Sequence, residues 1–371
     1  MVQEGWKFPE EKVFGEEIMM ATPFFTVLMP VHNGAKYLSK AVNSILQQTF
    51  ADFELVIIND CSTDDTLAIC QNFAKRDKRV LVYSTVTNKG VANARNEALK
   101  HINGQYFTFI DADDYIEQDI FAHAHAKLRE TKAQILKYGV TEEYFNKYDQ
   151  LTGTKKIALQ EMFLSQQQEI RKNILAMEKL PLFGYGCNTF YNTDFFNLHT
   201  VKFGDEYRVN EDFMFNLDVF EYVETMACLS TCAYHYAKRA DKSLSTTANP
   251  EYFRLQTVKI EKLLTRFQEW QLLDQQTSQD IYWLYTRYVY SDVCRILALA
   301  GEEAAIEEIK NIFASELYQK YRAVKFVDIS IKERTMISCL QEQHTHRIIN
   351  LCKMMNFVKS NFQVLFALIK G

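Results

Sequence analysis

The sequence predicts an α/β protein with a mixed, mainly parallel sheet flanked by helices, followed by a mostly helical C-terminal region. From Pro23, short apolar runs rich in β-branched and aromatic residues alternate with amphipathic segments of helical length, which is the pattern of a parallel sheet. From about Glu251, apolar residues recur three and four positions apart, as at Leu284 and Tyr288, which indicates helices.

The apolar runs predict buried strands, and the segments between them predict helices. The expected strands are 24–31, 53–58, 80–83 and 106–110. The expected helices are 35–48, 65–76 and 91–102. Ser62 or Asp64 can cap the second helix. Residues 130–180 show no regular period, and the Gly-punctuated stretch 184–188 predicts a loop that lines a pocket.

The segment 205–221 predicts a helix that begins at Glu211 and Asp212. Apolar residues at helical spacing can form its buried face, namely Phe213, Leu217 and Phe220. Both carboxylates then lie at the helix N-terminus, where the helix dipole favours negative charge.

Composition and charge exclude several classes of protein. The chain has 371 residues, 47% of them hydrophobic, with 42 Lys or Arg and 47 Asp or Glu, so its formal net charge is −5. These values indicate a folded globular protein and argue against nucleic acid as a partner. The eight scattered Cys include no CxxC pair, which argues against a zinc knuckle or a disulfide scaffold.

Targeting and membrane patterns are missing from the sequence, so we expect a cytoplasmic protein. Residues 1–22 lack the basic start and apolar stretch of a secretory signal, and no stretch of 18 uncharged apolar residues occurs. We expect an N-terminal extension (1–22), an α/β domain (23–247) and a helical region (248–371). The basic, apolar segment 344–371 contains no acid. It predicts either peripheral contact with the inner face of the cell membrane or a helix packed on protein.

Polar side chains follow the predicted strands, at the edge where open α/β sheets bind ligands. Asp111 and Asp113 come directly after the fourth strand, and side chains two apart in an extended chain point the same way. A bridging Mg²⁺ or Mn²⁺ would compensate both carboxylates and the charge of a diphosphate. An isolated Asp-x-Asp match also fits a solvated surface, so the prediction depends on its place after a buried strand.

Asp60 and Arg95 are candidate ligands of a nucleotide. Asp60 ends the second strand and can accept a hydrogen bond from a base N–H, while residues 62–64 build the turn and cap. Arg95 follows Asn88-Lys89-Gly90 by about one helical turn and can meet a phosphate with its planar guanidinium. A surface ion pair is the alternative for Arg95.

Five motifs together resemble family 2 glycosyltransferases, which are inverting enzymes with the GT-A fold. They are PVHNGAKYL (30–38), VIINDCSTDDT (56–66), NKGVANARNEAL (88–99), FIDADD (109–114) and NEDFMF (210–215). The resemblance is very specific over 24–115, looser to about 247, and weak in the final third. It implies a glycosyltransferase domain over 23–247, with a nucleotide-sugar half (23–115) and an acceptor half (116–247).

The resemblance implies a role for each matching residue. It implies nucleobase contact at Pro30, Val31, His32 and Asp60, with Asn33 as a further residue that binds the nucleotide-sugar. It implies that the rest of the nucleotide-sugar lies along Asn88, Gly90, Arg95, Asp111 and Ala112. Asp111 would contact the ribose and a metal ion, Asp113 would contact the metal ion, and Asp212 would be the general base.

The implied activity is metal-dependent transfer of a sugar from a nucleoside-diphosphate sugar, which we expect to be a UDP-sugar. The acceptor would be a saccharide or a lipid-linked molecule in cell-surface polysaccharide synthesis. Asp212 would take the proton of the acceptor hydroxyl in one inverting displacement, even with an ordinary carboxyl pKa of about 4. Mn²⁺ or Mg²⁺ would neutralise the leaving diphosphate.

Residues 231–246 are similar to an aromatic segment that follows the Glu-Asp motif in bacterial surface-polysaccharide transferases. Arg239 and Ser245 are the candidates there for contact with the diphosphate, and we interpret His235 as a packed strand residue. The His-x-His pairs at 123/125 and 344/346 read as surface or core histidines, since helical residues two apart do not face each other. Where the family often has Trp-Asn-Lys-Leu, residues 187–190 are Cys-Asn-Thr-Phe.

Three other functions are open to the sequence. A dinucleotide-dependent oxidoreductase is disfavoured because only Gly34 stands where a GxGxxG cluster is needed. A phosphatase is disfavoured because Asp114-Tyr115 replaces the small continuation that such sites use. The main alternative is a catalytically inactive GT-A-like binding or scaffold subunit of a polysaccharide synthase complex. The joint presence of Asp60, the Asp-x-Asp pair and Asp212 argues against it.

Overall fold

The computed structural model describes residues 22–204, 210–239 and 252–361. The strands are β1 (Phe25–Val31), β2 (Phe53–Asn59), β3 (Val80–Ser84), β4 (Tyr106–Phe109), β5 (Tyr115–Ile116), β6 (Ile135–Phe145), β7 (Leu151–Ile157), β8 (Met162–Leu164), β9 (Thr189–Asn192) and β10 (Met226–Arg239). The helices are α1 (Ala35–Leu46), α2 (Thr66–Arg76), α3 (Val91–Ala98), the 3-10 turn η1 (Leu99–His101), α4 (Ile120–Thr131), α5 (Gln167–Lys179), α6 (Thr193–Asn197), α7 (Glu211–Val219), α8 (Tyr252–Glu269), α9 (Gln275–Ala314), α10 (Glu316–Arg322), α11 (Ile331–Gln341) and α12 (Thr345–Asn361).

The strands of the described residues form one mixed sheet in the order β3-β2-β1-β4-β9-β6-β10-β5, with β7 paired to β6 and β8 paired to β10. β1 pairs in parallel with both β2 and β4, and β2 pairs in parallel with β3. The carboxyl ends of these strands therefore lie at one edge of the sheet, as the sequence predicts. The second half mixes directions, because β9 runs antiparallel to β4 and β6 while β10 runs parallel to β6.

The predicted strands and helices of the first half are confirmed to within a few residues. Every residue of β1 is buried, which is the pattern of a strand covered on both faces. The helix expected over 91–102 is α3 followed by η1. The N-cap of α2 is Asp65, whose side chain makes no capping hydrogen bond, so the predicted cap by Ser62 or Asp64 is wrong. Asp64 instead accepts a hydrogen bond from the Thr66 N–H at 3.0 Å and closes the turn just before the helix.

Residues 130–180, which lack a regular period in sequence, form the β6–β7 hairpin, β8 and α5. Charged side chains inside the buried part of β6 conceal its strand pattern, because Lys137, Glu142 and Glu143 are all less than a tenth exposed. Sequence periodicity assumes that charges face water, so it fails where a strand buries them.

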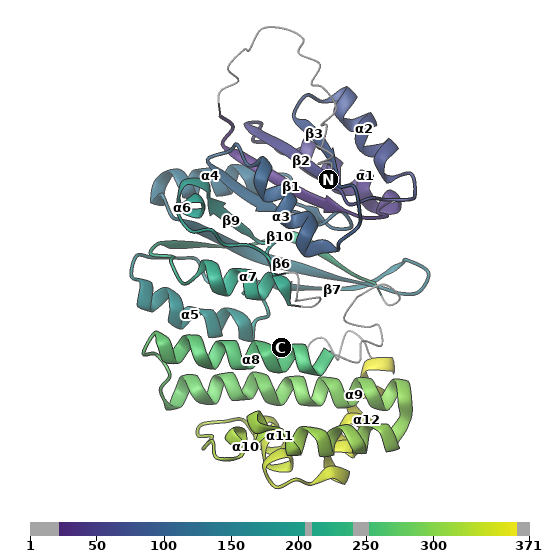
Figure 1. Ribbon diagram of the computed structural model, residues 1–371, viewed down its shortest axis with the longest axis vertical. Helices are drawn as coiled ribbons and strands as arrows, with labels where there is room; N and C mark the ends of the chain where they lie inside the picture. Colours follow the sequence, from purple (N-terminus) through teal and green to yellow (C-terminus); the bar gives the residue numbers. More distant parts are fainter. Residues whose placement is uncertain (1–21, 205–209, 240–251, 362–371) are drawn as a thin grey trace, which may run out of the picture.

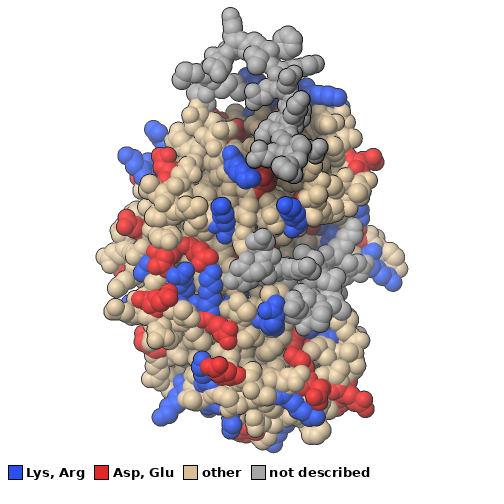
Figure 2. Space-filling model, viewed as in Figure 1, with Lys and Arg blue, Asp and Glu red and all other residues tan. Residues whose placement is uncertain are grey.

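The predicted helical region begins with α8 and extends through α12. Figure 1 shows α8 and α9 beside α5, on the side of α7 away from the sheet, with α10, α11 and α12 packed beyond α9. A backbone break at Gly301 (φ 87°) interrupts α9. None of the helices in the described ranges is long and apolar enough to cross a lipid bilayer. On the face drawn in Figure 2, basic and acidic side chains are interspersed.

Candidate active site

Segments from distant parts of the chain meet at the carboxyl edge of the parallel strands. The turns after β1, β2 and β4 lie there because these strands run in parallel. The start of α7 joins them, because Glu211 and Asp212 both reach Arg95 of α3. The site therefore combines the nucleotide-sugar half and the acceptor half of the predicted domain.

Arg95 is the centre of this arrangement. Its guanidinium pairs with Asp111 (Nη2 to Oδ1, 3.2 Å), with Glu211 (Nη1 to Oε1, 2.9 Å) and with Asp212 (Nη1 to Oδ1, 2.5 Å). Arg95 is only 4% exposed. Three carboxylates around one cation raise the pKa of Arg95 against the effect of burial. The geometry thus gives Arg95 a buried ionic network in place of the surface ion pair, and its predicted phosphate contact stays a prediction.

Asp212 has the environment expected of a general base. Burial raises its pKa to about 7, Arg95 opposes that rise, and Glu211 and Asp111 add to it. The Gly186 N–H donates to Asp212 Oδ2 at 3.5 Å. A Cβ at position 186 would lie 3.5 Å from the Asp212 carboxyl carbon, so the glycine loop packs directly against this side chain. The expectation of an ordinary pKa near 4 is wrong, because it neglects burial.

The predicted shared orientation of Asp111 and Asp113 is wrong. Residues 111–114 form a turn closed by the Asp114 N–H and the Asp111 carbonyl at 3.2 Å, whereas the prediction assumed an extended chain. Asp111 faces Arg95, while the 57% exposed side chain of Asp113 lies 3.5 Å from Arg239. Ala112 is buried within the turn.

Asp114, the next residue, is structural. Its buried carboxylate accepts hydrogen bonds from the Tyr234 hydroxyl and the Ala237 N–H, both at 2.8 Å. Burial, together with the charges of Asp113 and Asp111, holds the pKa of Asp114 well above its usual range. Asp114 thereby fastens the turn after β4 to β10.

Asp111 and Asp113 are the two side chains at the turn that could ligate a metal ion. Asp111 and Asp113 offer only oxygen ligands, which suit Mg²⁺ and Mn²⁺. Within the described ranges, no three or more His, Cys, Asp or Glu side chains gather in a group that could hold a metal ion.

The turns after β1 and β2 form the predicted nucleobase end. The buried Asp60 carboxylate accepts a hydrogen bond from the Thr85 hydroxyl at 2.7 Å. The Asp60 backbone contacts Val31 and His32, two of the other residues predicted to meet the nucleobase. Its N–H donates to the Val31 carbonyl, and its own carbonyl lies 2.7 Å from His32 Nδ1. Pro30, the preceding residue of β1, is also buried.

Asn33 helps to hold the turns after β1 and β2 together. Its side chain accepts from the Thr63 N–H at 2.8 Å, and its own N–H donates to Ser62 Oγ at 3.0 Å, so it helps to build the turn. Asn88 accepts from the Gly90 N–H at 2.9 Å, and Gly90 has a φ of 92° that favours glycine. Whether these residues also contact a nucleotide stays a prediction.

Arg239 lies at the end of β10, beside the Asp-x-Asp turn. It pairs with Asp149 at 3.3 Å and stacks on the Tyr37 ring, with 3.8 Å between guanidinium carbon and ring centroid. Sequence reasoning missed both partners: Asp149 lies at the tip of the β6–β7 hairpin, which carries no recognisable motif, and Tyr37 lies far away in α1. Ser245 lies outside the described residues.

His235 is a packed strand residue, as expected. Its ring nitrogens lie 3.0 Å from Glu143 and 2.8 Å from Glu117, and its ring stacks on Tyr115. Of the His-x-His residues, His125 packs its ring against Phe50.

Lys137 is a buried residue near the site that sequence reasoning missed. Its amine donates to Thr189 Oγ1 at 2.6 Å, to Asn188 Oδ1 at 3.0 Å and to the Tyr185 carbonyl at 3.3 Å. Burial lowers its pKa to about 8. Lys137 pairs with Thr189 across β6 and β9, so an amine from the neighbouring strand reaches the position where the family motif often has lysine. The one signal in the sequence for this buried amine was a single Lys within an apolar run.

Comparisons with known proteins show which proteins this sequence is similar to. Residues 26–196 match the model of "Glycosyl transferase family 2". Over 117 residues the chain is 41% identical to glycosyltransferase GlyA of Streptococcus pneumoniae, covering 32% of this chain and 17% of that protein. Over 233 residues it is 26% identical to poly(ribitol-phosphate) β-N-acetylglucosaminyltransferase TarS of Staphylococcus aureus, covering 62% of this chain and 38% of that protein. The chain thus spans less than half the length of either curated relative.

The fold itself matches a solved structure. A crystal structure of S. aureus TarS 1–349 in complex with UDP-GlcNAc superposes with a TM-score of 0.64 and 21% identity, covering 89% of this chain and 90% of that one. The chain therefore has the GT-A fold. Within that fold, residues 26–196 are similar to glycosyl transferase family 2.

Proposed function

We propose that the chain is an inverting, metal-dependent glycosyltransferase. It would move a sugar from a UDP-sugar to a saccharide or lipid-linked acceptor in cell-surface polysaccharide synthesis. The observation that carries the proposal is the partly buried Asp212, whose pKa is raised to about 7 and which shares Arg95 with Asp111. Relatives support the setting, since one is described as a minor teichoic acid biosynthesis protein, GgaB of Bacillus subtilis. The donor is supported by TarS structures with UDP and UDP-GlcNAc.

The residues of this chain suggest how the displacement proceeds. The acceptor oxygen forms a bond to the anomeric carbon while the bond from that carbon to the diphosphate breaks, and the leaving oxygen keeps the electron pair. Asp212 takes the proton of the acceptor hydroxyl. A base with a pKa of about 7 is well matched to this transfer near neutral pH. A Mg²⁺ or Mn²⁺ ion held at Asp111 and Asp113 would stabilise the diphosphate charge.

The test of the proposed function is release of nucleoside diphosphate. Wild-type protein is supplied with UDP-, GDP- and dTDP-sugars, with Mn²⁺, Mg²⁺ or a chelator. We expect UDP release from a UDP-sugar that depends on the metal and is lost on Asp113→Ala. The exposed variant Glu307→Gln, on α9, should match wild type and serves as the control. A chain that binds UDP in calorimetry but never releases it from any donor would instead be the scaffold subunit.

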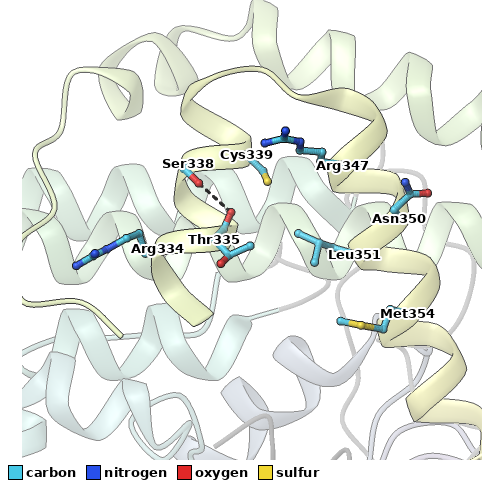
Figure 3. A pocket seen from close by; sticks show the side chains of 8 residues that line it. All are labelled: Arg334, Thr335, Ser338, Cys339, Arg347, Asn350, Leu351 and Met354. Atoms are coloured by element: carbon cyan, nitrogen blue, oxygen red, sulfur yellow. Dashed lines mark hydrogen bonds between the residues drawn. The ribbon is translucent and has the colours of Figure 1, made fainter. Parts of the chain in front are cut away.

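We also propose that the helical end of the molecule contacts an anionic membrane, on the cytoplasmic face. A groove of about 630 Å³ between α11 and α12 is lined by Arg334, Thr335, Ser338, Cys339, Arg347, Asn350, Leu351 and Met354 (Figure 3). No acid lines this groove, and among the described residues neither arginine side chain has an ion-pair partner. Large apolar side chains are exposed on the same two helices, namely Ile331, Met354 and Phe357. Residues 362–371, the rest of the predicted basic segment, lie outside the described residues.

Vesicle sedimentation tests this contact. We expect the protein to sediment with vesicles of phosphatidylglycerol and not with those of phosphatidylcholine, because anionic lipid attracts basic groups by about 1 kcal/mol each. The double variant Arg334→Ala/Arg347→Ala should sediment less. Lys310→Ala/Lys320→Ala, which removes two exposed but paired lysines, is the matched control. Equal sedimentation of both doubles would contradict the proposal.

A further inference from the structure

The helical region places a buried amine behind the candidate base. Lys259 of α8 pairs with Glu178 of α5, with 2.5 Å between Nζ and Oε1 and with both side chains almost fully buried. The same amine lies 3.9 Å from the centroid of the Phe213 ring. Phe213 directly follows Asp212 in α7. A charge of the helical region therefore packs against the residue next to the base.

A second path leads from the same pair to Asp212 through the glycine loop. Glu178 Oε2 is buried without a hydrogen-bond partner in the described part of the chain. A Cβ at Gly184 would lie 3.5 Å from this oxygen and 3.5 Å from the Phe213 ring, so the loop fits closely between them. Two residues further on, Gly186 donates its N–H to Asp212. The pair thus contacts both segments that hold the base.

This pair is unlike the surface ion pairs of the molecule. Burying two charges is costly unless they are paired with good geometry. Glu178 accepts a further hydrogen bond from the Tyr288 hydroxyl of α9 at 3.3 Å. Glu178 and Tyr288 raise the pKa of Lys259 against the effect of burial, so the amine stays charged. A fixed cation over an aromatic ring also restrains that ring.

We propose that Lys259, held by Glu178, is a positioning residue for Asp212, so the helical region is part of the catalytic unit. This inference rests on the proposed function. In this proposal, Lys259 of α8 holds α7 and the loop 184–186 in a fixed position relative to each other. Misplacement of a base by about 1 Å can cost about 100-fold in rate, so a small shift of these segments would matter.

The experiment compares two double variants, each of which removes an ion pair between a lysine of α8 and an acid of a neighbouring helix. Lys259→Met/Glu178→Gln removes the buried pair without leaving either charge alone. Lys262→Met/Asp218→Asn removes a partly exposed pair that also joins α8 to α7, and it is the matched control. We expect kcat to fall about 10- to 100-fold in the first double and less than about twofold in the control. The donor KM should stay within about twofold in both, since β1 to β4 carry none of these residues.

A conservative variant and a local measurement separate positioning from simple stability. Lys259→Arg keeps a cation over Phe213 and should retain most of the wild-type kcat. Hydrogen exchange at the amides of residues 184–186 should be faster in the first double than in the control. Wild-type kcat and unchanged exchange in the first double would overturn the inference. If that double does not fold, Phe213→Leu replaces it, and wild-type kcat in that variant would equally overturn the inference.

The exchange measurement also separates this inference from the proposed function. If wild-type protein releases no nucleoside diphosphate from any donor, the proposed activity is wrong. Faster exchange at residues 184–186 in the first double would then still support the positioning role, and unchanged exchange would reject it.

Discussion

The two ends of the candidate site hold their polar groups in different ways. At the proposed nucleotide end, formed by the turns after β1 and β2, Asp60 and Asn33 are fixed by hydrogen bonds from Thr85 and from the Thr63 backbone. At the base end, formed by Arg95 and its three carboxylates, the groups are ionic and the cation is buried. Hydroxyl and amide contacts shape a surface for recognition. Concentrated buried charge changes pKa, which is what proton transfer requires.

The largest expected effect is at the base end. Asp212→Asn keeps the shape of the side chain but cannot accept the proton, so kcat should fall about 10²- to 10⁴-fold. The affinity for UDP should stay near that of wild type, because the nucleotide end is unchanged. Steady-state kinetics and calorimetry with UDP make the measurement. A variant that retains wild-type kcat would show that another group is the base.

Arg95→Met tests the cation of the base end. Three carboxylates would lose their common partner, so the free energy of unfolding in urea should fall by about 3 to 5 kcal/mol. The pKa of Asp212 should rise further, because Arg95 is the group that lowers it. Arg79→Met, which removes a half-buried pair with Asp77, should cost less than about 1 kcal/mol. Equal losses in the two variants would contradict the special role of the base end.

The pH dependence of the reaction gives a third test. The base must be deprotonated, so kcat/KM should fall about tenfold for each pH unit below the Asp212 pKa of about 7. Stability has the opposite sign, since the folded pKa lies above the ordinary value of 3.8. The contribution of Asp212 to stability is therefore fully present below about pH 4 and is lost as the pH rises to 7. A profile of kcat/KM that is flat from pH 5 to 8 would exclude Asp212 as the base.

The smallest expected effect is at the nucleotide end. Thr85→Val removes the hydroxyl that donates to Asp60, which costs about 1 kcal/mol and so weakens UDP binding about fivefold. kcat should be unchanged, because the base end is untouched. Thr152→Val removes an exposed hydroxyl that donates to a backbone carbonyl of the hairpin, and it should leave UDP affinity as in wild type. A loss of kcat in Thr85→Val would show that the two ends are coupled.

Local patterns predicted the parts of the fold whose cause is local. The strands β1 to β4 are apolar runs with a helix after each of the first three. The helix α7 was predicted with its acidic start because its apolar positions recur at helical spacing. The resemblance added the prediction that Asp111 and Asp212 belong to the same site. Sequence periodicity alone could not have indicated this.

Packing between distant segments decided the rest. Arg95 meets Glu211 across 116 positions, and Lys137 meets Thr189 across 52, so neither contact leaves a mark in the local sequence. The pKa of Asp212 was misjudged for the same reason, since burial depends on what covers a residue. The turn at Asp111 escaped prediction because Tyr234, from β10, fixes it.

The shared guanidinium of Arg95 has a consequence for how such chains can diverge. One basic group balances acids at three other positions, so a change at position 95 disturbs all of them together. If these residues were replaced one at a time, each intermediate protein would contain a buried charge without its partner. Across descendants, the four positions should therefore be kept or replaced as a block, and a copy that has lost one should soon lose the others.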